Sequence, residues 1–105
     1  MDYYTVAAKW WADKIRMNRI NSKRKSINSF EHRLSVLIKE HVEEHGSMTL
    51  STNHVPDLTL HNLAKETHIN DKEFPCKATM HILIDGSIIS VKDGYGSSFE
   101  SIFPC

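Results

Sequence analysis

The chain has 105 residues, of which 40% are hydrophobic and 25% are charged, and its formal net charge at pH 7 is zero. These are ordinary values for a globular protein, which excludes extensive disorder, and the length predicts one domain over residues 1–105. No apolar run approaches the roughly 20 residues of a membrane-spanning helix, and two cysteines are too few for a disulfide scaffold. The first residues lack the pattern of a secretion signal, so we expect a cytoplasmic protein.

Residues 4–19 are predicted to form the first helix. Ala7, Trp11 and Ile15 fall on one stripe at helical spacing. Trp10 precedes Trp11, and adjacent helix positions point about 100° apart, so both indoles cannot enter one core. The second indole either packs under the sheet or is exposed as an anchor for a partner, a role in which tryptophan is favoured.

The second helix is predicted at residues 29–45, because apolar residues recur there at helical spacing. Asn28 stands three residues before Glu31, which is the spacing of a capping box at a helix start. Gly46 follows the stripe and fits the left-handed residue that ends many helices. Residues 21–25 are expected to form a polar, basic connector between the two helices.

The rest of the chain reads as short strands with one further helix. A short helix is predicted to begin at Pro56-Asp57, and residues 70–75 are predicted to form a loop. Asp85-Gly86 indicates a two-residue hairpin turn, because a type I′ turn needs positive φ at both positions. Strands are predicted where apolar and polar residues alternate, at residues 47–52, 76–84, 87–91 and 99–103.

This order of elements predicts the fold class. Two N-terminal helices are followed by a short strand and a short helix, and then by an antiparallel hairpin or meander of three to four strands. Helices grouped ahead of antiparallel strands favour an α+β fold over a parallel, doubly wound sheet.

The charges are segregated along the chain. The first 25 residues hold seven Lys or Arg and two Asp, a net charge of +5, and the remaining residues carry −5. A basic front attracts acidic surfaces or phosphates. Six positive charges in residues 14–25 exceed what compensation of a helix dipole needs. The residues expected to bind a partner are Trp10, Trp11, Lys14, Arg16, Arg19, Lys23, Arg24 and Lys25.

One short motif has the spacing of a metal site. Residues 41–45 match H-x-x-E-H, in which two imidazoles on one helix face bind zinc and the glutamate acts as a general base. A third ligand would have to come from elsewhere, with Glu73 or Asp93 as guesses. A buried stripe and a helix dipole explain the same residues without a metal, so we expect no metal and no cofactor. The alternative is a small zinc hydrolase centred on His41, Glu44 and His45.

Other catalytic motifs are absent from the sequence. It contains no G-x-S-x-G, Walker loop or G-x-G-x-x-G pattern. Cys76 and His81 lie on one predicted strand at odd separation, so they point to opposite faces and form no Cys–His pair. We therefore do not expect an enzyme.

Three segments of the chain resemble short orphan proteins from phages and mobile elements of low-GC bacteria. They are residues 9–16 (KWWADKIR), residues 74–80 (FPCKATM) and the turn at residues 93–96 (DGYG). Some of those proteins inhibit host defence, and anti-CRISPR proteins are among them. The resemblance implies an inhibitor, and it assigns a role to no particular residue.

The sequence-based hypothesis is a non-enzymatic binding protein that acts by occupying a macromolecular partner. The partner is expected to be a protein or a ribonucleoprotein complex, and the resemblance makes a host defence nuclease its most concrete form. An alternative is a nucleic-acid-binding regulator that uses the basic segment 14–25. No membrane partner is expected, and the sequence leaves the oligomeric state open.

Overall fold

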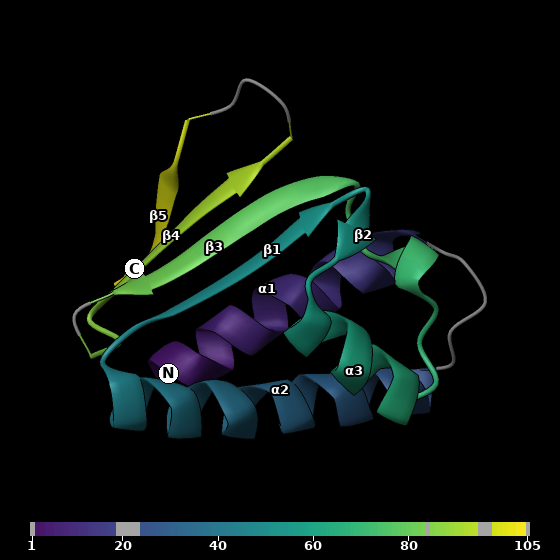
Figure 1. The fold of residues 1–105 in the computed structure, drawn as a ribbon, viewed down its shortest axis with the longest axis horizontal. Helices are drawn as coiled ribbons and strands as arrows, with labels where there is room; N and C mark the ends of the chain where they lie inside the picture. The colour runs from purple at the N-terminus through teal and green to yellow at the C-terminus, as the bar shows by residue number, and fades with distance from the viewer. Residues whose placement is uncertain (1, 19–23, 84, 95–97, 105) are drawn as a thin grey trace.

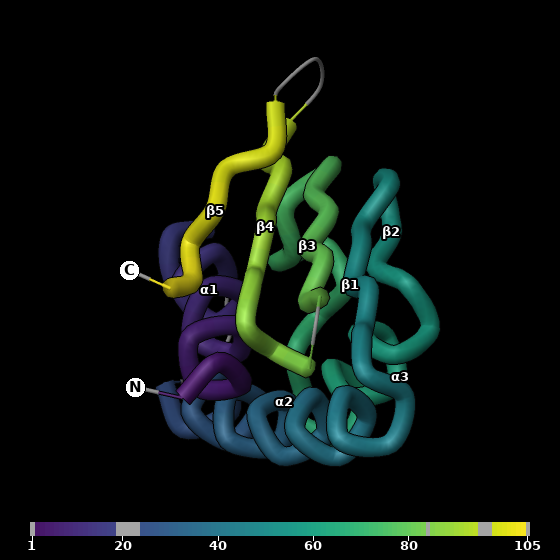
Figure 2. The backbone as a smooth tube through the Cα atoms, turned by 90° about the vertical axis from the view of Figure 1, so that its left-hand side faces the viewer, coloured from purple at the N-terminus to yellow at the C-terminus, as the bar shows by residue number. Residues whose placement is uncertain are grey.

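The computed structural model describes residues 2–18, 24–83, 85–94 and 98–104. Helices lie on one side of a five-stranded antiparallel sheet (Figure 1). The strand order is β2-β1-β3-β4-β5, with β5 and β2 at the two edges (Figure 2). The predicted α+β class, with N-terminal helices ahead of antiparallel strands, is confirmed.

The elements form close to their predicted positions. The helices are α1 (Tyr3–Asn18), α2 (Arg24–His45) and α3 (Leu58–Glu66), followed by the 3-10 turn η1 (Asp71–Glu73). The strands are β1 (Met48–Asn53), β2 (Val55–Pro56), β3 (Lys77–Leu83), β4 (Ile88–Asp93) and β5 (Glu100–Phe103). The two-residue strand β2 was not predicted, because two residues are too few to show an alternating pattern.

Helix α2 begins at Arg24, ahead of the predicted start at residue 29. The predicted capping box of Asn28 and Glu31 is wrong, because both residues lie inside the helix. Their side chains instead accept hydrogen bonds from the Arg16 guanidinium of α1, at 3.0 and 2.6 Å. The spacing that resembles a helix start therefore serves a contact between two helices.

A capping box does form at η1, inside the segment predicted as a loop. The Asn70 side chain accepts a hydrogen bond from the Lys72 backbone N–H at 2.9 Å. The Glu73 carboxylate accepts one from the Asn70 backbone N–H at 3.0 Å, and this residue is buried. The Asn-x-x-Glu spacing was the signal that could have revealed the turn.

The core lies between the helices and the inner face of the sheet. Trp11 of α1, Phe30 of α2 and Phe74, which follows η1, are all buried. The Phe74 ring lies edge-on to the other two, with centroids 6.4 Å from Trp11 and 5.6 Å from Phe30. Val42 ends the buried stripe of α2, whereas His41, which was expected there, is exposed.

The two faces of the sheet differ in chemistry. On β3 the buried residues Ala78, Met80 and Ile82 alternate with more exposed ones. The described helices all pack against the buried side, so the other side faces solvent (Figure 1). We call this solvent side the outer face; its positions on β1, β3 and β4 are Thr49, Ser51, Asn53, Lys77, Thr79, His81, Leu83, Ile88, Ser90 and Lys92.

The turn between β3 and β4 confirms the predicted positive φ angles, with φ 54° at Asp85 and 87° at Gly86. The Asp85 N–H donates to the Gly46 carbonyl at 2.9 Å, which joins the turn to the end of α2. Gly46 itself has φ 82°, as expected for a residue that ends a helix. Gly86 lies against the Tyr3 ring of α1, so three elements meet at this turn.

The two glycines allow a matched test of this packing. A Cβ added at Gly86 would lie 2.5 Å from Tyr3 ring carbons, whereas one at Gly46 would meet Asp85 Oδ1 at 3.3 Å. Gly86→Ala should lower the free energy of unfolding by about 2–4 kcal/mol, since steric overlap adds to the strain of positive φ. Gly46→Ala should cost only about 1 kcal/mol. Urea unfolding measures both, and equal losses would contradict the described contact.

Candidate functional site

Those residues predicted to bind a partner that the structure describes do not form one continuous exposed face. Arg19 and Lys23 lie outside the described residues. Trp11 is fully buried, so it is the core indole. Trp10 is half-buried, packs edge-on against Trp11 at 4.9 Å and carries the Lys14 ammonium 5.1 Å from its ring centroid. Neither indole is therefore a freely exposed anchor.

Arg16 is held by a cluster of acceptors between α1 and α2. Its guanidinium contacts Asp13 at 2.8 Å and Glu31 at 2.6 Å, in addition to Asn28. Burial lowers the pKa of Arg16, but hydrogen bonds from the guanidinium to Glu31 and Asp13 raise it above its ordinary value. Arg16 is therefore a cation that joins two helices and whose charge is paired with two carboxylates.

Asp13 is the centre of this cluster on α1. It accepts from Lys9 as well as from Arg16, each at 2.8 Å. Burial raises the pKa of Asp13, but the two hydrogen bonds outweigh this effect and leave the pKa below its ordinary value. The carboxylate form is thus favoured in the folded protein.

Lys14 is also engaged, because its ammonium lies 2.6 Å from the Asp93 carboxylate at the end of β4. This ion pair borders a hollow of about 480 Å³, which Met17, Lys72 and Cys76 also line. Of the predicted cations in the described residues, Arg24 and Lys25 are the exposed pair outside the Arg16 and Lys14 contacts.

Three exposed cations, Arg24, Lys25 and Lys72, lie at one end of the molecule. There α1 ends, α2 begins and η1 lies close by, as Figure 1 shows. The Asn18 side chain donates to the Lys72 carbonyl at 3.1 Å, which ties the end of α1 to η1. Met17 is 70% exposed beside this contact. We call this surface the basic end; it consists of Met17, Arg24, Lys25 and Lys72.

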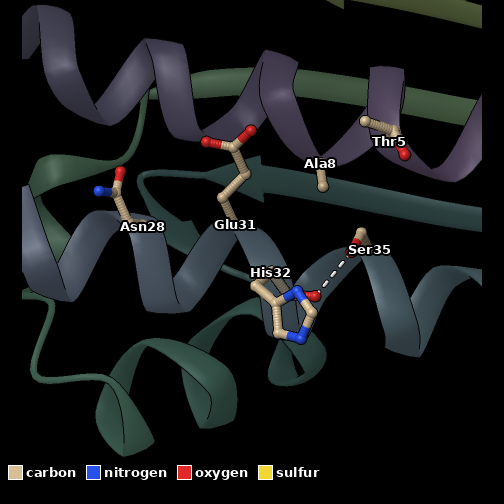
Figure 3. A pocket seen from close by; sticks show the side chains of 6 residues that line it. All are labelled: Thr5, Ala8, Asn28, Glu31, His32 and Ser35. Atoms are coloured by element: carbon tan, nitrogen blue, oxygen red, sulfur yellow. Dashed lines mark hydrogen bonds between the residues drawn. The ribbon is translucent and has the colours of Figure 1, made fainter. Parts of the chain in front are cut away.

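A second hollow, of about 380 Å³, lies along the seam between α1 and α2. Figure 3 shows Thr5 and Ala8 on α1 facing Glu31, His32 and Ser35 on α2. The Ser35 hydroxyl donates to the His32 carbonyl at 2.6 Å, and Glu31 is engaged by Arg16. The Ser35 hydroxyl and the Glu31 carboxylate that line this hollow therefore already form hydrogen bonds within the helical layer.

The H-x-x-E-H motif brings two imidazoles together on α2. The rings of His41 and His45 have centroids 4.5 Å apart, and both residues are exposed. The two guessed third ligands are elsewhere, since Glu73 is in the η1 capping box and Asp93 binds Lys14. Within the described residues, no set of three or more His, Cys, Asp or Glu side chains is placed to hold a metal ion.

A Cys–His pair exists that the sequence analysis missed. The Cys76 Sγ lies 3.2 Å from the His54 Nδ1, and the His54 N–H donates to the Cys76 carbonyl at 2.7 Å. The pair forms because antiparallel β1 and β3 align Asn53 with Lys77, so His54, which follows Asn53, lies beside Cys76, which precedes Lys77. Strand register supplies this contact, and the 22-residue separation in the sequence carries no motif for it.

An aromatic and cationic group lies on the outer face. The Phe99 ring, which is 48% exposed, lies over β3 with its centroid 5.0 Å from that of His81. The Lys92 ammonium lies 6.0 Å from the Phe99 ring centroid. His81 Nδ1 is 3.0 Å from the Thr49 hydroxyl on the neighbouring strand. The sequence carries no local pattern for this group, because its four residues come from four separate segments.

The chain matches no model of a known protein family and no curated protein. In the described part of the chain, none of the helices has the length and hydropathy needed to span a bilayer.

The acidic cluster at Asp13 predicts a pH-dependent contribution to stability. Asp13→Asn should lower the free energy of unfolding at pH 7 by less than about 1 kcal/mol, because the ion pairs are partly exposed. A carboxyl group whose pKa is lowered by folding stabilises the folded state at pH values above its unfolded pKa of about 3.9. This stabilisation is lost as pH falls through the folded pKa. Urea unfolding should therefore show the two proteins converging below about pH 4, and a constant difference down to pH 2 would contradict this.

The two tryptophans should differ in their effect on folding. Trp11→Ala should cost about 3–5 kcal/mol, because it removes a fully buried ring from the core. Trp10→Ala should cost about 1 kcal/mol, since its ring is half-buried at the edge of that core. Thermal unfolding followed by circular dichroism distinguishes them, and the reverse order would refute the assignment of Trp11 to the core.

Proposed function

We propose that the protein is a non-enzymatic, cytoplasmic binding protein that acts by occupying a macromolecular partner, a protein or a ribonucleoprotein complex. The basic end carries this proposal. Arg24 and Lys25 are exposed in the first turn of α2, which contains no acidic residue. The helix dipole places partial positive charge there, so each cation costs about 0.3–1 kcal/mol of helix stability. Residues that violate a local stability rule are characteristic of functional sites.

The surroundings of these cations suit a contact surface. Met17 presents 70% of its side chain to solvent, and a flexible thioether adapts to the shape of a partner. Lys72 adds a further exposed cation. Positive charge around an apolar contact favours an acidic partner surface and speeds its encounter.

A host defence nuclease is the most concrete partner. This choice follows the resemblance of residues 9–16, 74–80 and 93–96 to short orphan proteins from phages and mobile elements, some of which inhibit host defence. In this form of the proposal, the basic end occupies an acidic surface of the nuclease complex and blocks its action, in the manner of anti-CRISPR proteins.

Nucleic-acid binding by the basic segment 14–25 is the second candidate. The exposure of Arg24 and Lys25 favours it, whereas Lys14 and Arg16 are already paired with carboxylates. Phosphate contacts would make affinity fall steeply with salt concentration, and this behaviour separates the candidate from a protein partner with an apolar contact.

Charge reversal at the start of α2 tests the proposed function. Arg24→Glu/Lys25→Glu should stabilise the fold by about 0.5–2 kcal/mol, because acidic residues suit the positive end of a helix. The same variant should lose its partner. The measurement is affinity capture by tagged protein from a low-GC bacterial host, quantified by mass spectrometry, with urea unfolding of each variant.

Lys65→Glu is the matched control, because Lys65 is exposed in the last turn of α3, where the dipole favours a cation. This control should lose a little stability and retain the partner. The recovered partner, if it is a nuclease, should lose activity when wild-type protein is added. Equal capture by wild type and the Arg24→Glu/Lys25→Glu variant would contradict the role of the basic end.

A further inference from the structure

The outer face combines aromatic, cationic and hydroxyl groups on one surface. Phe99 lies on His81, and Lys92 lies beside the same ring. The β3–β4 register places Lys92 opposite Thr79, and Lys77 is the next position along β3 on this face. Lys92 therefore lies beside the exposed ring, and Lys77 lies further along β3 on the same face.

The charge on this face differs from that of the chain around it. Residues 26–105 contain eleven Asp or Glu and six Lys or Arg. The outer-face positions of β1, β3 and β4 include two of those lysines, Lys77 and Lys92, and none of those carboxylates. The ion pairs of the described residues involve other side chains, and Lys77 and Lys92 are both partly exposed. A locally positive face on an acidic segment is complementary to an anionic ligand.

The ring and the cations together indicate which anion fits. Bases stack on exposed aromatic rings, and phosphates pair with lysines, when single strands lie across an open antiparallel sheet. A duplex keeps its base faces stacked inside and would leave Phe99 without a partner. We propose that the outer face binds single-stranded nucleic acid, with a base on the Phe99 ring and backbone phosphates at Lys77 and Lys92.

The inferred site is separate from the basic end in both residues and chemistry. The basic end lies where α1, α2 and η1 meet, whereas the outer face lies on the opposite side of the sheet from the helices (Figure 1). The Thr49 hydroxyl fixes the His81 imidazole at 3.0 Å, so the ring beneath Phe99 is held before a ligand arrives. A preformed ring platform lowers the ordering cost of binding.

Fluorescence anisotropy tests this site. The probes are a labelled 12-nucleotide single strand of mixed sequence, as RNA and as DNA, and the matching duplex. The single strand should bind at least tenfold more tightly than the duplex. Phe99→Ala should weaken single-strand binding roughly fivefold to hundredfold, which corresponds to one lost base stack. Phe99→Tyr, which keeps the ring, should bind like wild type. Lys77→Ala/Lys92→Ala should reduce the slope of log affinity against log salt by roughly 1.4, or 0.7 per phosphate.

Two controls keep the interpretation specific. Leu58→Ala truncates an apolar side chain that is 72% exposed on α3 and should leave binding unchanged. Phe99→Leu keeps apolar bulk without the ring, so it should weaken binding even if Phe99→Ala unfolds the protein. Circular dichroism confirms the fold of each variant.

Three results would overturn the inference. The first is that folded wild-type protein binds neither the RNA nor the DNA single strand at 50 mM salt. Binding that is lost in Arg24→Glu/Lys25→Glu and kept in Phe99→Ala would place the nucleic acid at the basic end. Loss of a captured protein partner in Phe99→Ala, with no oligonucleotide binding, would make the outer face a protein-docking surface.

Discussion

The burial of Trp11 against Phe74 holds the helical layer to one face of the sheet, and the accessible surfaces follow from this packing. Trp11 comes from α1, and Phe74 lies just before β3, so their contact joins the first helix to the strand at the centre of the sheet. Phe30 of α2 completes the cluster. Aromatic burial of this kind contributes strongly to a small core. Since the apolar positions of the strands turn toward this cluster, the polar positions turn to solvent.

The same packing divides the positive charges into two groups. Antiparallel α1 and α2 bring Arg16 to Glu31 and Asn28, while Lys14 reaches Asp93 at the end of β4. These cations hold elements together. Arg24 and Lys25, at the start of α2, project from the seam and remain exposed. A charge count along the sequence treats these four residues alike, although Lys14 and Arg16 are paired with carboxylates and, within the described part of the chain, Arg24 and Lys25 are not.

The two proposed contact surfaces place different demands on the fold. The basic end depends on where two helices and η1 meet. The outer face depends on strand register, because residues from β1, β3 and the segment before β5 must align to bring Thr49, His81 and Phe99 together. A small domain can therefore present two contact surfaces without enlarging its core, since each uses side chains that the core does not require.

Sequence alone determined the features that depend on residues close together in the chain. Helical periodicity located α1 and α2, and Asp85-Gly86 located the turn between β3 and β4, because spacing and φ preference act within one element. Tertiary structure decided which indole is buried, why Asn28 and Glu31 face Arg16, and how β1 and β3 bring Cys76 to His54. Those outcomes depend on helix packing and strand register, which join residues that are distant in the sequence and leave no local pattern.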